Sequence, residues 1–149
     1  LATTALHFKE QGYSISYISP VNEPQYNWSS GQEGSGWQNS EVVKLVRNLD
    51  QSLTSKGLDS TNILVDEAGA WNDLYEADAT AGNGRSDVIN DFFNPSSSDY
   101  IGNLKHVPAL ICAHSYWLDT SWDQLQSTRQ KVKLQLKQKI SRFTKRNGA

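Results

Sequence analysis

Apolar stretches along the chain predict three strands. Residues Tyr13–Val21 alternate aromatic and β-branched side chains with serines before the stretch becomes apolar, which is the pattern of a strand. Asn62–Val65 and Val107–Ala113 are almost wholly apolar, as in strands whose two faces are both covered. Such strands are typical of parallel sheets flanked by helices.

Helical patterns separate these strands. In the clearest one, apolar residues recur at three- and four-residue steps between Ser40, which we predict as the N-cap, and Gly57, where the helix stops. The other predicted helices are Leu1–Gln11, Ser86–Phe93 and Thr120–Phe143. The order is helix, strand, helix, strand, helix, strand, helix, which predicts βαβ units and a parallel α/β sheet.

The turns after the strands distinguish between two α/β architectures. A nucleotide-binding doubly wound sheet requires a glycine-rich turn such as GxGxxG, and no such turn follows a strand here. Instead, each strand ends in polar groups: Asn22-Glu23, then Glu67, then His114 to Tyr116. Functional residues at the carboxyl ends of successive strands are typical of a (β/α)₈ barrel, which is the fold we predict.

Composition indicates a soluble globular domain. The chain has 149 residues, of which 37% are hydrophobic, and no apolar run approaches the roughly 18 residues of a membrane span. No signal peptide is visible, and the first residues already have a helical pattern, so we expect a fragment of a larger fold. A single cysteine, Cys112, excludes an internal disulfide and a cysteine-cluster metal site. We expect neither a metal nor a cofactor.

Charge is distributed unevenly. All acidic residues lie at or before Asp123, and this part has a net charge of −10. Residues Arg129–Arg146 carry +8 with no acid, which together give the total of −2. We interpret residues 129–149 as a basic helix and tail whose lysines face water. Without aromatic interleaving or a known motif, the basic run does not favour a nucleic-acid partner, and we expect no membrane partner.

Asn22-Glu23-Pro24 has the strongest chemical signal. A carboxylate at the end of a buried strand, beside an amide, lies in a cleft, where it can act as a general acid. Proline excludes the helical region for the residue before it, so we expect an extended backbone at Glu23. A solvated surface turn is the alternative for the tripeptide alone; the polar ends of the other two strands favour the functional interpretation.

A longer set of motifs identifies a family. Residues 18–28 (ISPVNEPQYNW) and Gln32-Glu33-Gly34 resemble glycoside hydrolase family 30, a retaining family in a large clan of (β/α)₈ barrels. Residues 66–71 (DEAGAW) and 114–117 (HSYW) agree with it in order and spacing. The resemblance covers roughly residues 1–130 and is greatest to the endo-β-1,6-galactanase-type branch. It implies that residues 1–149 are part of one catalytic domain, comprising barrel strands four to six with their helices.

The resemblance also implies residue roles. Glu23 would be the general acid/base, and Asn22 would bind the 2-hydroxyl of a sugar. A polysaccharide or oligosaccharide would be the substrate, with six further contact residues. We predict Glu67 as a substrate or supporting group, with a structural ion pair as the alternative. His114 and Tyr116 would position a carboxylate, and the sugar platforms would be Trp28, Trp71 and Trp117, although each tryptophan alone is more often a core residue.

One element of the family pattern is missing. The family places its nucleophile, a second glutamate, at the end of strand seven, but no acidic residue follows Asp123. We therefore expect the chain alone to be inactive. Xylanase-type or glucosylceramidase-type specificity, a non-catalytic carbohydrate-binding module and an inactive remnant all remain as alternatives. Polysaccharide hydrolases act outside the cytoplasm, so the resemblance implies an extracellular or periplasmic location. The sequence does not indicate an oligomeric state.

Overall fold

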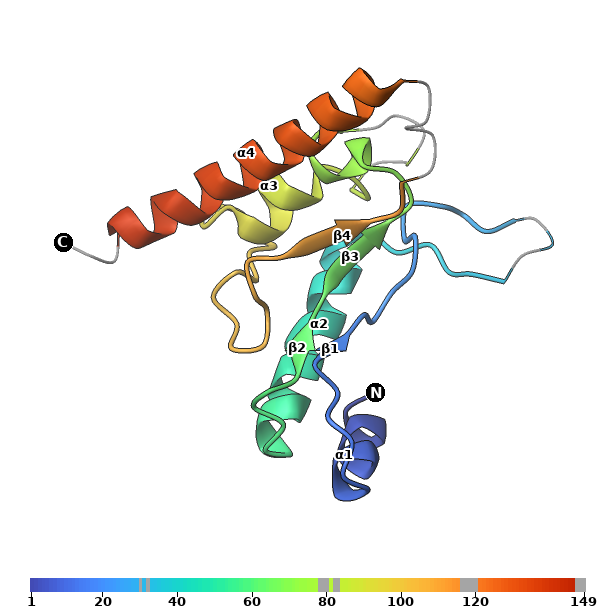
Figure 1. Cartoon of the computed structure of the whole chain (residues 1–149), viewed down its shortest axis with the longest axis vertical. Coiled ribbons are helices and arrows are strands. Elements are labelled where there is room, and N and C mark those ends of the chain that lie inside the picture. Colours follow the sequence, from blue (N-terminus) through green and yellow to red (C-terminus); the bar gives the residue numbers. More distant parts are fainter. Residues whose placement is uncertain (30, 32, 78–80, 82–83, 116–120, 147–149) are drawn as a thin grey trace.

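The computed structural model of the chain describes residues 1–29, 31, 33–77, 81, 84–115 and 121–146, with backbone alone for 141–146. It is a mixed α/β structure in which helices and short strands alternate (Figure 1). The elements are α1 (Ala2–Glu10), β1 (Tyr17–Ile18), α2 (Asn39–Ser55), β2 (Asn62–Ile63), β3 (Val65–Ala68), the 3₁₀ turn η1 (Asn72–Leu74), α3 (Val88–Phe93), β4 (Ile111–Ala113) and α4 (Trp122–Arg146).

The strands pair in parallel, as the sequence predicts. β1 pairs with β2 through Tyr17 and Asn62, and β3 pairs with β4 through Val65 and Ile111. Residues 62–68 therefore run between the other two strand segments, with β3 and β4 side by side in Figure 1. The described residues form two short two-stranded sheets, and no closed barrel is present among them.

The helices contact each other in chain order. α1 contacts α2, α2 contacts α3, and α3 contacts α4, while α2 also covers β2. The core between helices and strands contains apolar side chains that are fully buried, among them Val42, Leu53, Ile63, Val65 and Phe92. This arrangement is that of successive βα units, and it sets the carboxyl ends of the strands along one edge. No helix in the described part of the chain combines the length and hydropathy of a membrane span.

Two of the three strands are shorter than predicted, whereas the predicted strand Asn62–Val65 is divided into β2 and β3 and extends to Ala68. Of Tyr13–Val21 only Tyr17 and Ile18 are strand, because the carbonyl of Ile15 accepts a bond from the Thr61 hydroxyl, at 2.8 Å, instead of a ladder N–H. Of Val107–Ala113 only the last three residues are strand. Pro108 has no N–H to donate, and its carbonyl accepts the N–H of Leu110 in a local turn.

Helix boundaries also differ in detail. α2 begins at Asn39, and its N-cap is Gln38, not Ser40 as predicted. The Gln38 and Glu41 side chains form a reciprocal capping box, in which Glu41 accepts the Gln38 N–H at 2.8 Å. Glutamine is not among the preferred N-cap residues, which explains why the serine two positions later was favoured. α3 begins at Val88, two residues after the predicted start, and α4 begins at Trp122 and extends to Arg146.

Candidate active site

Glu23 lies beyond β1, at the edge formed by the carboxyl ends of the strands. It is buried, with 7% of its surface exposed, and Pro24 beside it is also buried. Its N–H donates to the carbonyl of Glu67 at 2.9 Å, so the strand-end residues predicted from the sequence are neighbours in space. Its carboxyl Oε1 lies 2.5 Å from Nδ1 of His114.

His114 follows β4 and is held by the strand next to it. Its N–H donates to the carbonyl of Ala68 at 2.8 Å, and its ring is about one-third exposed. An ionised carboxylate can only accept hydrogen bonds, so Nδ1 of His114 carries the proton of the contact when Glu23 is ionised. The pair thus joins a carboxyl group and an imidazole that lie 91 residues apart in the sequence.

Both strand-end glutamates have left-handed backbones. The φ of Glu23 is +46° and that of Glu67 is +49°, so the extended backbone predicted at Glu23 was wrong. Pro24 excludes the right-handed helical region for Glu23, but it leaves other regions open. A non-glycine residue in this region costs of order 1 kcal/mol and persists only where its surroundings enforce it. Such strain clusters at functional sites, which supports a role for this edge.

Trp28 packs beside Glu23 and is fixed in two ways. Its Nε1–H donates to the Glu23 carbonyl at 3.2 Å, and its ring contacts Tyr26 edge to face with centroids 6.0 Å apart. The ring also lies directly against Gly34, where an added Cβ would come within 2.1 Å of Trp28 Cδ2. The glycine of the Gln-Glu-Gly motif therefore leaves space for this half-buried tryptophan.

Gln25 and Asp66 form a buried contact that sequence reasoning missed. Gln25 Nε2 donates to Asp66 Oδ2 at 2.6 Å, and Gln25 Oε1 accepts the Gly69 N–H at 3.1 Å. Asp66 is fully buried, and its burial raises its pKa to about 8 despite the bond from Gln25, with Asp73 and Glu67 adding to the rise. Its position directly before Glu67 was visible in the sequence, but its partner was not.

The remaining predicted contact residues differ in their surroundings. Asn22 is exposed beside Glu23, and Glu67 is half-buried at the end of β3. Trp71 packs against the core, with the Arg129 guanidinium 5.7 Å above its ring, so α4 covers one face of this predicted sugar platform. Tyr116 and Trp117 lie outside the described residues. The roles of all these residues stay predictions.

No metal centre is found in the part of the chain that the structure describes. There, no three His, Cys, Asp or Glu side chains lie close enough to hold an ion. Cys112 is a free, half-buried cysteine of β4, and burial raises its pKa to about 11, so it is a thiol at neutral pH.

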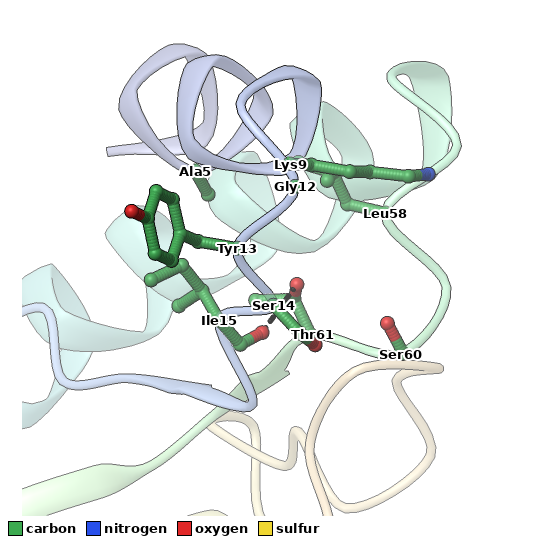
Figure 2. Close-up of a pocket in the computed structure, with 9 residues that line it drawn as sticks. All are labelled: Ala5, Lys9, Gly12, Tyr13, Ser14, Ile15, Leu58, Ser60 and Thr61. Carbon is green, nitrogen blue, oxygen red and sulfur yellow. Dashed lines mark hydrogen bonds between the residues drawn. The ribbon is translucent and has the colours of Figure 1, made fainter.

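A pocket of about 240 Å³ lies near the amino ends of β1 and β2, at the opposite end of the strands from Glu23 (Figure 2). Tyr13 and Lys9 line it together with Ser14, Ser60 and Thr61. Lys9 Nζ already donates to the Gly57 carbonyl at 2.8 Å, and the Thr61 hydroxyl donates to Ile15. The Lys9 and Thr61 side chains are therefore occupied by backbone carbonyls, and the strand-end edge around Glu23 is the better candidate for catalysis.

The chain is similar to known proteins over most of its length. Residues 1–144 match the family profile described as O-glycosyl hydrolase family 30. Among solved structures, the chain is similar to a conserved exported protein from Bacteroides fragilis, with 30% sequence identity and a TM-score of 0.84. That match covers 93% of this chain and 28% of the other, so the chain spans less than a third of its length. No match was found among curated proteins.

Proposed function

Because the chain belongs to O-glycosyl hydrolase family 30, we propose that it carries the acid/base half of the active site of a retaining hydrolase. Its substrate would be a β-linked polysaccharide, and β-1,6-galactan is the one that the sequence motifs favour. The observation that carries the proposal is the buried Glu23 carboxyl, which lies 2.5 Å from His114 at the carboxyl ends of the strands. That edge is where barrel enzymes place their chemistry.

Glu23 acts in both steps of the proposed reaction. In the first, its protonated carboxyl donates to the glycosidic oxygen while a nucleophilic carboxylate attacks the anomeric carbon. In the second, the Glu23 carboxylate takes a proton from the water that hydrolyses the glycosyl-enzyme. His114 holds the carboxyl in one orientation between these steps, because a single donor at Oε1 restricts its rotation.

The substrate would lie over this edge. Exposed Asn22, next to Glu23, is placed to bind the sugar 2-hydroxyl, an interaction that strengthens in the transition state. The Trp28 ring supplies an aromatic face. The hydrogen bond from Trp28 Nε1–H to the Glu23 carbonyl fixes the orientation of this ring. Glu67, Trp71, Tyr116 and Trp117 complete the proposed contact set. An endo mode of action is part of the same proposal.

The nucleophile belongs to the other half of the barrel. Retaining chemistry requires two carboxyl groups about 5–5.5 Å apart on either side of the sugar. We propose that residues 1–149 supply barrel strands four to six, and that the second carboxyl comes from strand seven. A (β/α)₈ barrel typically has about 250 residues, and the chain spans 28% of the solved structure it resembles. The chain alone should therefore turn over no substrate.

An extracellular or periplasmic site of action is consistent with the proposed substrate. β-Linked polysaccharides such as β-1,6-galactan lie outside the cytoplasm, and the similar Bacteroides fragilis protein is described as exported. Detection of the protein in the culture medium or periplasm, in the absence of cell lysis, would support this location.

The function can be tested in a completed barrel. Residues 1–144 would replace the equivalent segment of an active family 30 hydrolase, and hydrolysis of β-1,6-galactan, xylan and glucosylceramide would be measured. Glu23→Gln should lower kcat by about 10²- to 10⁴-fold, the usual contribution of a general acid/base. The matched control is Glu10→Gln, an exposed glutamate at the end of α1. Equal activity of the two variants would refute the role of Glu23.

A further inference from the structure

A buried side-chain bridge lies directly behind the candidate acid/base. Gln25, with 1% of its surface exposed, is two residues after Glu23. Its amide donates to Asp66 at 2.6 Å and accepts from the Gly69 N–H at 3.1 Å. One side chain from the loop after β1 thus binds both ends of segment 66–69, which comprises the last three residues of β3, Glu67 among them, and Gly69.

Segment 66–69 also holds the two partners of the candidate site. The Glu67 carbonyl accepts the Glu23 N–H at 2.9 Å, and the Ala68 carbonyl accepts the His114 N–H at 2.8 Å. The backbones of Glu23 and His114 are therefore both anchored on the end of β3. Any shift of the end of β3 relative to Glu23 would change the distance between the Glu23 carboxyl and the His114 ring.

Stability alone does not account for the bridge. Asp66 is fully buried, and its Oδ1 has no hydrogen-bond partner among the described residues. A buried polar atom without a hydrogen-bond partner is unfavourable compared with an apolar side chain of similar size. In addition, Glu23 and Glu67 have left-handed backbones, which persist only where neighbouring contacts enforce them. The bridge joins the segments that contain these two residues.

We propose that Gln25 is a positioning residue, which acts through Asp66 and Gly69 to hold Glu23 in register with His114. The proposal rests on the function proposed for Glu23, but its geometry can be tested without turnover. Gln25 contacts no reacting atom in this role. It sets the place of the loop that contains Glu23 relative to the end of β3, on which both Glu23 and His114 are anchored.

The test uses NMR of the full chain with ¹⁵N-labelled histidine. A short Nδ1–H contact to a carboxylate gives a downfield proton signal that exchanges slowly with water. His114 should show this signal, and Glu23→Gln should weaken it, which assigns it. His106 is an internal control for folding, because its buried ring contacts the Thr61 carbonyl and the Thr54 hydroxyl at 2.7 and 3.1 Å and neither bridge residue is one of these partners.

Two double variants separate positioning from simple stabilisation. Gln25→Met with Asp66→Leu removes both polar partners together, which keeps the buried volume but deletes the bridge. It should lose the His114 signal while the His106 signals stay in place. Gln25→Glu with Asp66→Asn exchanges the amide and the carboxyl, so that residue 66 donates and residue 25 still accepts from Gly69. It should restore the His114 signal.

The outcomes are distinct. An unchanged His114 signal in the folded apolar double variant would overturn the proposal, as would an exchanged pair that folds without the signal. If the apolar variant does not fold, the exchanged pair and the single variant Asp66→Asn still test the proposal. Both retain a hydrogen bond between residues 25 and 66, so both must retain the His114 signal. A positive result with an inactive completed barrel would refute the proposed function and leave the positioning role intact.

Discussion

Asp66→Asn should remove a pH dependence from the stability of the fold. Asp66 is fully buried in β3, and burial raises its pKa from 3.8 to about 8, with its bond from Gln25 as the opposing effect. The folded state therefore keeps a proton that the unfolded state has already lost at neutral pH. Asparagine has the same shape and can accept the Gln25 bond, but it does not ionise.

The sign and size of this pH dependence follow from the thermodynamic linkage between proton binding and folding. Since the folded state binds more protons, the contribution of Asp66 to stability is fully present below about pH 4 and falls as pH rises towards 8. Each pKa unit corresponds to about 1.4 kcal/mol. The free energy of unfolding of the wild type should therefore decrease by about 3 kcal/mol, relative to Asp66→Asn, between about pH 5 and about pH 7.

Urea unfolding at about pH 5, 6, 7 and 8 would measure this difference. Asp59→Asn is a suitable control, because Asp59 is exposed and its pKa is lowered by the hydrogen bond and charge of Lys105. The contribution of Asp59 to stability is present above its ordinary pKa and is lost only in more acidic solution. The difference in the free energy of unfolding between wild type and Asp59→Asn should therefore stay constant over the same pH range. A constant difference between wild type and Asp66→Asn from pH 5 to pH 8 would refute the reasoning.

Three further changes have definite expected results. Gly34→Ala should displace the Trp28 ring and alter its fluorescence, since the new Cβ would lie 2.1 Å from that ring; an unaltered spectrum would contradict the contact. Cys112 should react with iodoacetamide much more slowly in the folded chain than in urea at pH 8, because its pKa is raised to about 11; equal rates would contradict this. Phe92→Ala should lower the free energy of unfolding by about 3–5 kcal/mol, and the same change at Phe8, which is 44% exposed, should have a much smaller effect.

Periodicity predicted the elements well, because they depend on local pattern. The helix after the Gly-rich loop has its apolar residues at three- and four-residue steps, and it forms as α2. The strand segments that contain Ile18, Ile63 and Ile111 were also located, and their parallel pairing follows from the helices between them. The ends of the strands were predicted less accurately. The Thr61 hydroxyl and Pro108 change the backbone hydrogen bonding in ways that apolar content does not indicate.

The site could be predicted only in part. The motif around Glu23 identified the family, and strand order placed His114 at the same edge as Glu23. The bridge from Gln25 to Asp66 depends on how two loops meet across 41 residues of sequence, so no local pattern could indicate it. The left-handed backbone at Glu23 was also hidden, since Pro24 limits that residue without selecting one remaining region.

The most direct test of the central claim is azide rescue of Glu23→Ala in the completed barrel. With a β-glycoside that has a good leaving group, the first step needs no acid, so the variant should accumulate the glycosyl-enzyme and turn over slowly. Azide can then enter the space left by the carboxyl and attack the intermediate. We predict restored turnover and a β-glycosyl azide product. Full activity without azide, no response to azide, or an α-glycosyl azide would contradict the assignment of Glu23 as the acid/base of a retaining hydrolase.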